Sequence, residues 1–170
     1  RAGPVRFLHS GTLYPYERNP DWFFRALAEL RAEGWLSPET ALFELRGSAH
    51  DECYAPKLAA LGLSDMVRLL PGVPYRDALR EMTEADVLML FQADNCNLQI
   101  PAKLYEYLYV GRPVMGLTDP AGDTGRLMAE LGIDAVARLD DVAAIKALVL
   151  RCVQQVTAGT AYAPPRDTVM

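Results

Sequence analysis

The sequence is poor in histidine and cysteine, which excludes several kinds of metal and disulfide protein. It has two histidines and three cysteines, and Cys53, Cys96 and Cys152 form no CxxC motif. We expect none of these cysteines to have a histidine partner nearby. We therefore expect no metal site. An odd number of widely spaced cysteines predicts reduced thiols rather than a disulfide framework. Cys96, in an expected loop, is either a reactive thiol or a bystander.

Lysine is scarce as well, and arginine supplies most of the positive charge. The net charge is −5, and lysine occurs only at Lys57, Lys103 and Lys146. Because nucleic-acid-binding proteins present a basic surface, this balance argues against a nucleic-acid partner. An anionic ligand has to be held by a few local cations and by backbone N–H groups.

Long apolar runs and leader segments are also missing. No run is long enough to span a bilayer, and no signal peptide is visible. The expected reduced thiols are what predict a cytoplasmic protein. Half of the residues, 51%, are hydrophobic, which predicts one globular domain with a sizeable core for 170 residues. The chain begins at Arg1 without an initiator methionine, so we expect a fragment whose targeting signals lie elsewhere.

Apolar runs and helical patterns alternate six times, which predicts an α/β fold: a doubly wound, Rossmann-like parallel sheet of about six strands with helices on both faces. Strands are expected at 5–9, 41–45, 67–70, 87–91, 113–117 and 135–139. Asn19 is expected to cap the first helix, Pro101 to open the helix that ends at Gly111, and Asp140 or Asp141 to cap the last. Residues 1–157 form the domain, and the Pro-rich tail 158–170 is expected to be loosely ordered or to cross to a partner domain.

The phosphate-binding motifs of two large enzyme classes are absent. No GxGxxG fingerprint follows the first strand, and the chain has no Walker A lysine motif. Both absences argue against NAD-dependent enzymes and P-loop NTPases.

One residue of the helix at 101–110 is disfavoured by helix electrostatics. Lys103 lies in the first turn, where the positive end of the macrodipole costs a surface cation about 0.3–1 kcal/mol. Glu106 lies three positions on and shares its face, so one explanation is a surface ion pair. The other is an anion site, because open α/β sheets bind anions at helix N-termini beyond the carboxyl ends of their strands.

Three segments resemble the GT4-type glycosyltransferases of the GT-B fold. Residues 101–114, PAKLYEYLYVGRPV, are similar to that family's P-(S/A)-K-x-x-E-Y-x-x-x-G-(K/R)-P-V segment. The loop 11–20 resembles G-(R/S/T)-L-…-(K/R)-(N/G)-x, and the segment 122–124 resembles part of P-x-G-x-T-x-x-L. The resemblance covers residues 5–154. It implies the C-terminal, donor-binding half of such an enzyme, with the N-terminal acceptor domain absent from this chain.

The resemblance also implies roles for individual residues. Lys103 and Arg18 are expected to stabilise the departing diphosphate as catalytic cations, and Glu106 to hydrogen-bond the ribose hydroxyls. Further contacts to the nucleotide sugar are expected from Gly11, Thr12, Gly72, Val73, Gln99 and Ile100. For Arg18 the alternative is a solvated loop charge, and for the residues at 72 and 73 it is a plain turn.

The chain departs from the family pattern at two positions. Thr12 stands where the family has an arginine after the loop glycine, and Leu98 stands where it has the first glutamate of E-x7-E. Asp94, Asn95 and Asn97 are the nearest polar side chains to a donor sugar, unless they belong to a solvated loop.

The function that the resemblance implies is sugar transfer from a UDP or GDP sugar to an acceptor hydroxyl, with retention of configuration and without a metal or cofactor. The acceptor, a sugar or a lipid-linked sugar, would bind the missing domain, which would also provide any peripheral association with the inner face of the membrane. The fragment alone should be inactive, and cell-surface polysaccharide synthesis is the expected pathway. The alternatives are a GT-B-like nucleotide-sugar epimerase and a non-catalytic nucleotide-binding or regulatory domain.

Overall fold

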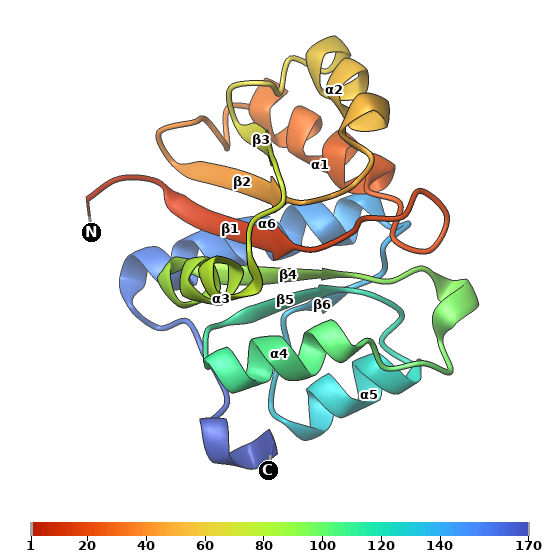
Figure 1. Cartoon of the computed structure of the whole chain (residues 1–170). Helices are drawn as coiled ribbons and strands as arrows, with labels where there is room; N and C mark the ends of the chain where they lie inside the picture. The colour runs from red at the N-terminus through yellow and green to blue at the C-terminus, as the bar shows by residue number, and fades with distance from the viewer. Residues whose placement is uncertain (1, 170) are drawn as a thin grey trace.

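The computed structural model describes residues 2–169, in which six strands alternate with helices (Figure 1). The elements follow in this order: β1 (Val5–Ser10), α1 (Asp21–Ala32), β2 (Ala41–Arg46), α2 (Asp51–Ala60), β3 (Val67–Leu70), α3 (Tyr75–Glu84), β4 (Val87–Phe91), η1 (Asp94–Cys96), α4 (Ala102–Val110), β5 (Val114–Leu117), α5 (Asp123–Glu130), β6 (Val136–Ala137), α6 (Val142–Ala158) and η2 (Arg166–Val169). Within residues 2–169, no helix has the length and apolar character that crossing a membrane requires.

The strands form one parallel sheet in the order β3-β2-β1-β4-β5-β6. The predicted Rossmann-like α/β fold is thus confirmed. The chain winds outward from β1 to β3, returns through α3 to β4, and then winds the other way. Sheets of this kind bind ligands at the carboxyl ends of the strands where the direction reverses, which here are β1 and β4.

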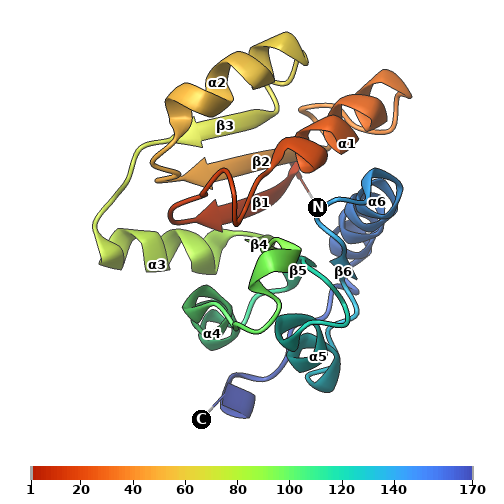
Figure 2. The same ribbon diagram turned by 90° about the vertical axis from the view of Figure 1, so that its right-hand side faces the viewer.

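Helices cover both faces of the sheet (Figure 2). They close a hydrophobic core on each face. One core packs α1, α2 and α6 against the sheet, and the other packs α3, α4 and α5. All five residues of β4 are buried, alternating between the two cores. This burial on both faces explains why β4 is apolar without alternation.

Helix ends differ from the predictions in detail. Pro101 is the residue before α4 rather than its first residue, because its ψ of 138° is extended while its φ of −62° suits either state. Asn19 lies two residues before α1, and its Oδ1 atom accepts from the N–H of Asp21 at 2.9 Å. The last helix agrees with its prediction, because Asp141 caps α6 and accepts from the N–H of Ala144 at 3.0 Å.

The segment after α6 turns back along the domain. The Tyr162 hydroxyl donates to the carbonyl of Leu131 at 2.9 Å. Further on, η2 lies in contact with α4, and the Arg166 side chain approaches Gly111 at the end of that helix. The segment therefore lies beside α4 and α5 (Figure 1).

Candidate functional site

A cavity of about 290 Å³ opens at the carboxyl edge of the sheet, among the loops that follow β1, β2 and β3 and the helices α3 and α4. Its lining brings together six of the predicted site residues, Gly11, Thr12, Gly72, Val73, Lys103 and Glu106. It also contains residues that the sequence did not single out, Ser10, Arg46, Gly47, Tyr75, Ala78 and Met82. Arg18, Gln99 and Ile100 do not line it.

Lys103 reaches across the cavity to the loop after β1. An ideal Cβ built on Gly11 would lie 3.3 Å from its Cε atom and 3.4 Å from Nζ. The φ of Gly11 is +124°, a conformation that L-residues rarely adopt. Glycine therefore serves both the backbone turn and the close approach of the lysine.

Glu106 pairs with this lysine. Its Oε2 atom accepts from Lys103 Nζ at 3.2 Å, and the two side chains are 18% (lysine) and 30% (glutamate) exposed. This is the ion pair that the first of the two explanations for Lys103 predicts. Both residues line the cavity, so the pair does not lie on an open surface. A carboxylate has more acceptor capacity than one ammonium occupies, so Glu106 retains acceptor positions for ligand hydroxyls.

A buried tyrosine fixes α4 relative to β1. The Tyr107 hydroxyl accepts a hydrogen bond from the N–H of Ser10 at 3.2 Å, and Tyr107 is fully buried. Burial also raises the pKa of its phenol. This contact connects the last residue of β1 to the helix that carries Lys103 and Glu106, so it sets the distance between the two sides of the cavity.

Several backbone donors remain without partners beside the lysine. Among residues 2–169 nothing accepts from the N–H groups of Thr12, Ala102 or Lys103, and no side chain caps α4. The N–H of Gly11, in contrast, donates to the carbonyl of Arg46 at 2.9 Å. Free N–H groups, a helix N-terminus and an ammonium together form an environment that stabilises a bound anion.

Arg18 lies in the loop between β1 and α1 but does not line the cavity. Its Nη1 atom donates to the carbonyl of Thr12 at 3.1 Å, and its Cζ lies 5.7 Å from the centre of the Tyr14 ring. In the observed conformation it braces the loop after β1.

His9, the residue before Ser10 in β1, was not predicted as a site residue from the sequence. It is buried, its Nδ1 atom lies 3.0 Å from the carbonyl of Met89, and its Nε2 atom is buried without a partner among residues 2–169. Burial is the main cause that lowers its pKa to about 4, and the charges of Arg18 and Lys103 lower it further. Both cations therefore contribute to a positive electrostatic potential at the same buried imidazole.

The residues before α4 brace a loop. The N–H of Gln99 donates to the carbonyl of Cys96 at 3.0 Å, so this group is not free to hold a phosphate. The Gln99 carbonyl accepts from Gln92 Nε2 at 2.8 Å and from Thr124 Oγ1 at 3.0 Å. The free donors of Ala102 and Lys103 lie one turn later, at the start of the helix itself.

The far end of the cavity is formed by glycines and a largely buried ion pair. An ideal Cβ on Gly47 would lie 3.3 Å from the Cα of Gly72, so the loops after β2 and β3 approach closely. Behind them Arg46 donates to Glu81 through two nitrogens, at 2.9 and 2.5 Å, and to the carbonyl of Pro71 at 2.9 Å. These residues were missed because only the fold brings β2 beside α3.

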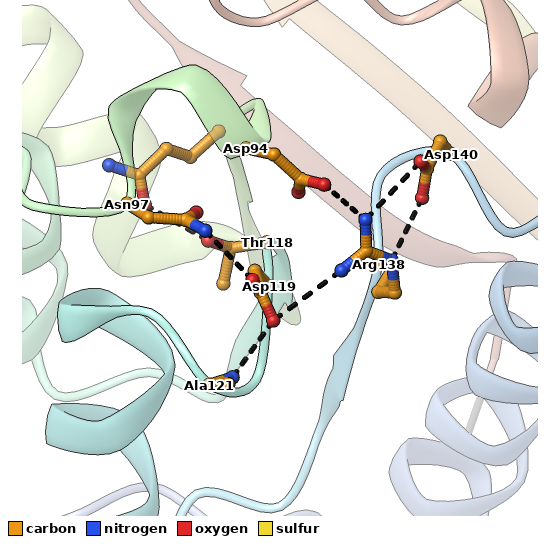
Figure 3. A network of polar contacts seen from close by, with 8 residues as sticks. Asp94, Asn97, Thr118, Asp119, Ala121, Arg138 and Asp140 are labelled. Atoms are coloured by element: carbon orange, nitrogen blue, oxygen red, sulfur yellow. Dashed lines mark hydrogen bonds and ion pairs between the residues drawn. The ribbon is translucent and has the colours of Figure 1, made fainter.

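Two of the three polar residues expected near a donor sugar, Asp94 and Asn97, belong to a network at the ends of β4, β5 and β6 (Figure 3). Asp94 is bonded to Arg138, and Asn97 Nδ2 donates to Asp119 at 2.8 Å. Leu98, by contrast, is 88% exposed. The side chains of Asp94 and Asn97 are therefore held in place rather than solvated freely.

The expectation that no histidine lies near a cysteine is wrong. The ligand atoms of His50, Glu52 and Cys53 lie within 4.8 Å of one another, because His50 immediately precedes α2 and the other two residues lie in its first turn. All three are at least partly exposed, and no fourth ligand joins them among residues 2–169. The cysteines form no disulfide, and burial raises the pKa of Cys96 and of Cys152.

Comparisons with known proteins support the fold. No protein-family model matches the chain, and no curated protein matches it. Among solved structures, WaaG, a glycosyltransferase involved in lipopolysaccharide biosynthesis, matches 94% of this chain and 40% of its own, at 17% identity and a TM-score of 0.72. Sucrose-phosphate synthase from Thermosynechococcus elongatus matches 94% of this chain and 38% of its own, at 13% identity and a TM-score of 0.69.

The lipopolysaccharide outer core galactosyltransferase WaaB matches 99% of this chain and 44% of its own, at 18% identity and a TM-score of 0.67. The chain thus spans about two fifths of the length of the solved structures it matches. At these identities the likeness is one of fold. The chain has the Rossmann-like fold of one half of a GT-B glycosyltransferase.

Proposed function

We propose that this chain is the donor-binding domain of a GT4-type glycosyltransferase, the C-terminal half of a GT-B enzyme. The single observation that carries the proposal is the position of Lys103. Its ammonium lies against Gly11 and beside Glu106, at the edge where β1 and β4 diverge. A nucleoside diphosphate needs a cation and free N–H groups for its phosphates and a carboxylate for its ribose diol, and this cavity offers all of them together.

In this proposal the diphosphate binds Lys103 Nζ and the free N–H groups of Thr12, Ala102 and Lys103. Glu106 accepts from the ribose hydroxyls, and the base lies toward Gly72 and Val73. When the sugar leaves, negative charge grows on the diphosphate, and preorganised donors stabilise it more than they stabilise the bound substrate. Arg18 adds to this field from the loop after β1.

Sugar transfer would proceed with retention of configuration and without a metal or cofactor, to an acceptor that also contacts a second domain. The named neighbours WaaG and WaaB act in lipopolysaccharide synthesis, which favours a saccharide acceptor of a cell-surface pathway. The fragment alone would bind the nucleotide without turnover, in the cytoplasm or peripherally at the inner face of the membrane through the other domain.

Calorimetric titration of the chain with UDP, GDP and ADP, with and without Mg²⁺, tests the proposal. We expect one nucleotide to bind with the same affinity in both conditions. Lys103→Ala should weaken it by about 1 kcal/mol or more, roughly fivefold. Lys57→Ala is the matched control, because Lys57 pairs with Asp21 on the surface, away from the cavity. Absence of binding by all three nucleotides to the folded chain would refute the proposal.

A further inference from the structure

A second cavity lies at the same edge of the sheet, beyond the ends of β4 and β6. It measures about 220 Å³ and is lined chiefly by Tyr16, Asn19, Trp22, Asp94, Leu139 and Asp140. It shares no lining residue with the cavity that Lys103 and Glu106 line. The loop between β1 and α1 borders both, with Gly11 and Thr12 at one and the aromatic and amide side chains at the other. The N–H of Ala93 donates to the carbonyl of Glu17 at 2.7 Å and fixes this loop over β4.

Two aromatic side chains belong to the lining of this second cavity. Tyr16 is 88% exposed and Trp22 is 41% exposed, whereas the next residue of α1, Phe23, is fully buried in the core. An aromatic ring at the wall of a cavity presents a flat apolar face to whatever enters it. The C–H face of a pyranose ring has the complementary shape and polarity.

The polar side of the cavity is held rigidly. Arg138 pairs with Asp94, and its Nε atom donates to Asp140 at 3.1 Å (Figure 3). Each carboxylate oxygen has a second acceptor position, so both acids keep capacity for hydroxyl groups. Groups that are already ordered lose little conformational entropy when they bind a ligand.

Charge and size further narrow the class of ligand. Asp119 Oδ1 lies 3.5 Å from Arg138 Nη1, so three carboxylates surround one guanidinium. The net charge of the cluster is therefore negative. A second phosphate would be repelled, whereas a neutral polyol would not. A volume of about 220 Å³ accommodates one sugar ring.

We infer that this cavity is a saccharide subsite, in which a neutral pyranose stacks on Trp22 and Tyr16 while its hydroxyls donate to Asp94 and Asp140. Asn19 contributes a donor, because its Oδ1 atom is occupied by the N–H of Asp21 and its amide N–H₂ group remains. The inference that this saccharide is the acceptor of the reaction rests on the proposed function.

An NMR titration of the chain with methyl glucoside, methyl galactoside and lactose tests this inference. At least one sugar should shift the Trp22 indole and the Asn19 side-chain amide resonances. Trp22→Ala and Asp140→Asn should each weaken binding by about tenfold. Tyr16→Ala should also weaken it, and its 88% exposure makes this variant safe for folding. Trp35→Ala, at the other tryptophan, is 63% exposed outside the cavity and should bind as the wild type does.

Titration of the same samples with UDP, GDP and ADP separates the two proposals. If a nucleotide binds and none of the three sugars shifts Trp22, the saccharide subsite is wrong while the donor site stands. If a sugar binds and Trp22→Ala does not weaken it, the subsite is also wrong. If a sugar binds through Trp22 and no nucleotide binds, the subsite stands and its role as acceptor site fails with the proposed function.

Discussion

The side chain of Lys103 lies against the backbone of Gly11, where an ideal Cβ would be 3.3 Å from the lysine Cε atom. The two residues come from the segments that follow β1 and β4, the strands at which the winding of the sheet reverses. Both residues line the cavity at the carboxyl edge of the sheet. Their contact places the ammonium among free N–H groups that a helix start provides.

Gly11→Ala is expected to weaken nucleotide binding because the new methyl group displaces Lys103. The substitution also strains the backbone at a φ of +124°, which should cost about 1–3 kcal/mol of stability. Gly34→Ala is the matched control: its φ is +82°, and no atom lies within 4 Å of its ideal Cβ. Urea denaturation and nucleotide calorimetry of both variants check the prediction. Equal nucleotide affinity in both would show that the lysine position does not matter.

The sequence predicted the strand pattern well because burial on both faces leaves a direct signal. The apolar run at 87–91 has to be a central parallel strand, and β4 is one. The first and last residues of individual strands and helices were less predictable. The strand expected at 135–139 narrows to Val136–Ala137, because Arg138 turns toward the acids of the neighbouring loops.

The site was predictable only where local chemistry is unusual. Lys103 stood out because a cation at a helix start is unfavourable, and the cavity contains it. Arg46 and Glu81 gave no such signal, since each is an ordinary charged residue of a strand or helix. Their pairing depends on how β2 and α3 pack, and no local pattern encodes that.

Lys103 and Glu106 should differ in what they recognise. If the lysine binds the diphosphate and the glutamate binds the ribose, Lys103→Ala weakens both a nucleoside diphosphate and inorganic pyrophosphate. Glu106→Ala should weaken the nucleoside diphosphate by about tenfold or more and leave pyrophosphate unchanged or tighter, because a negative charge is removed. Calorimetry with both ligands checks this. Equal losses for pyrophosphate in the two variants would contradict separate roles.

The Arg46–Glu81 pair should contribute to stability as well as to the cavity. The side chains are only 14% (Arg46) and 24% (Glu81) exposed, so Glu81→Ala leaves a largely buried guanidinium with one carbonyl partner. We expect a loss of about 1–3 kcal/mol in the free energy of unfolding. Asp65→Ala is the control, because Asp65 is half exposed where it pairs with Arg31. Surface pairs contribute about 0–1 kcal/mol, so equal losses would mean that burial of the Arg46 pair adds nothing.

The buried His9 should make stability depend on pH. Its pKa is lowered to about 4, mainly by burial, from an ordinary value of 6.5. Between these values the unfolded chain binds a proton that the folded chain does not, so the free energy of unfolding should fall as the pH is lowered from about 6.5 to about 4. One proton over that window corresponds to about 3 kcal/mol. Above pH 6.5 this contribution should be constant.

Urea denaturation across that pH range checks the prediction when the wild type is compared with His9→Asn. Asparagine keeps an N–H donor near the Met89 carbonyl but does not titrate, so the variant should lose stability less steeply on acidification. Acids such as Asp119, whose pKa is lowered chiefly by a hydrogen bond from Ala121, also lose stabilising interactions at low pH. Their effect is common to both proteins and cancels in the difference. An identical slope in wild type and His9→Asn would mean that His9 takes up its proton as easily in the folded chain as in the unfolded one.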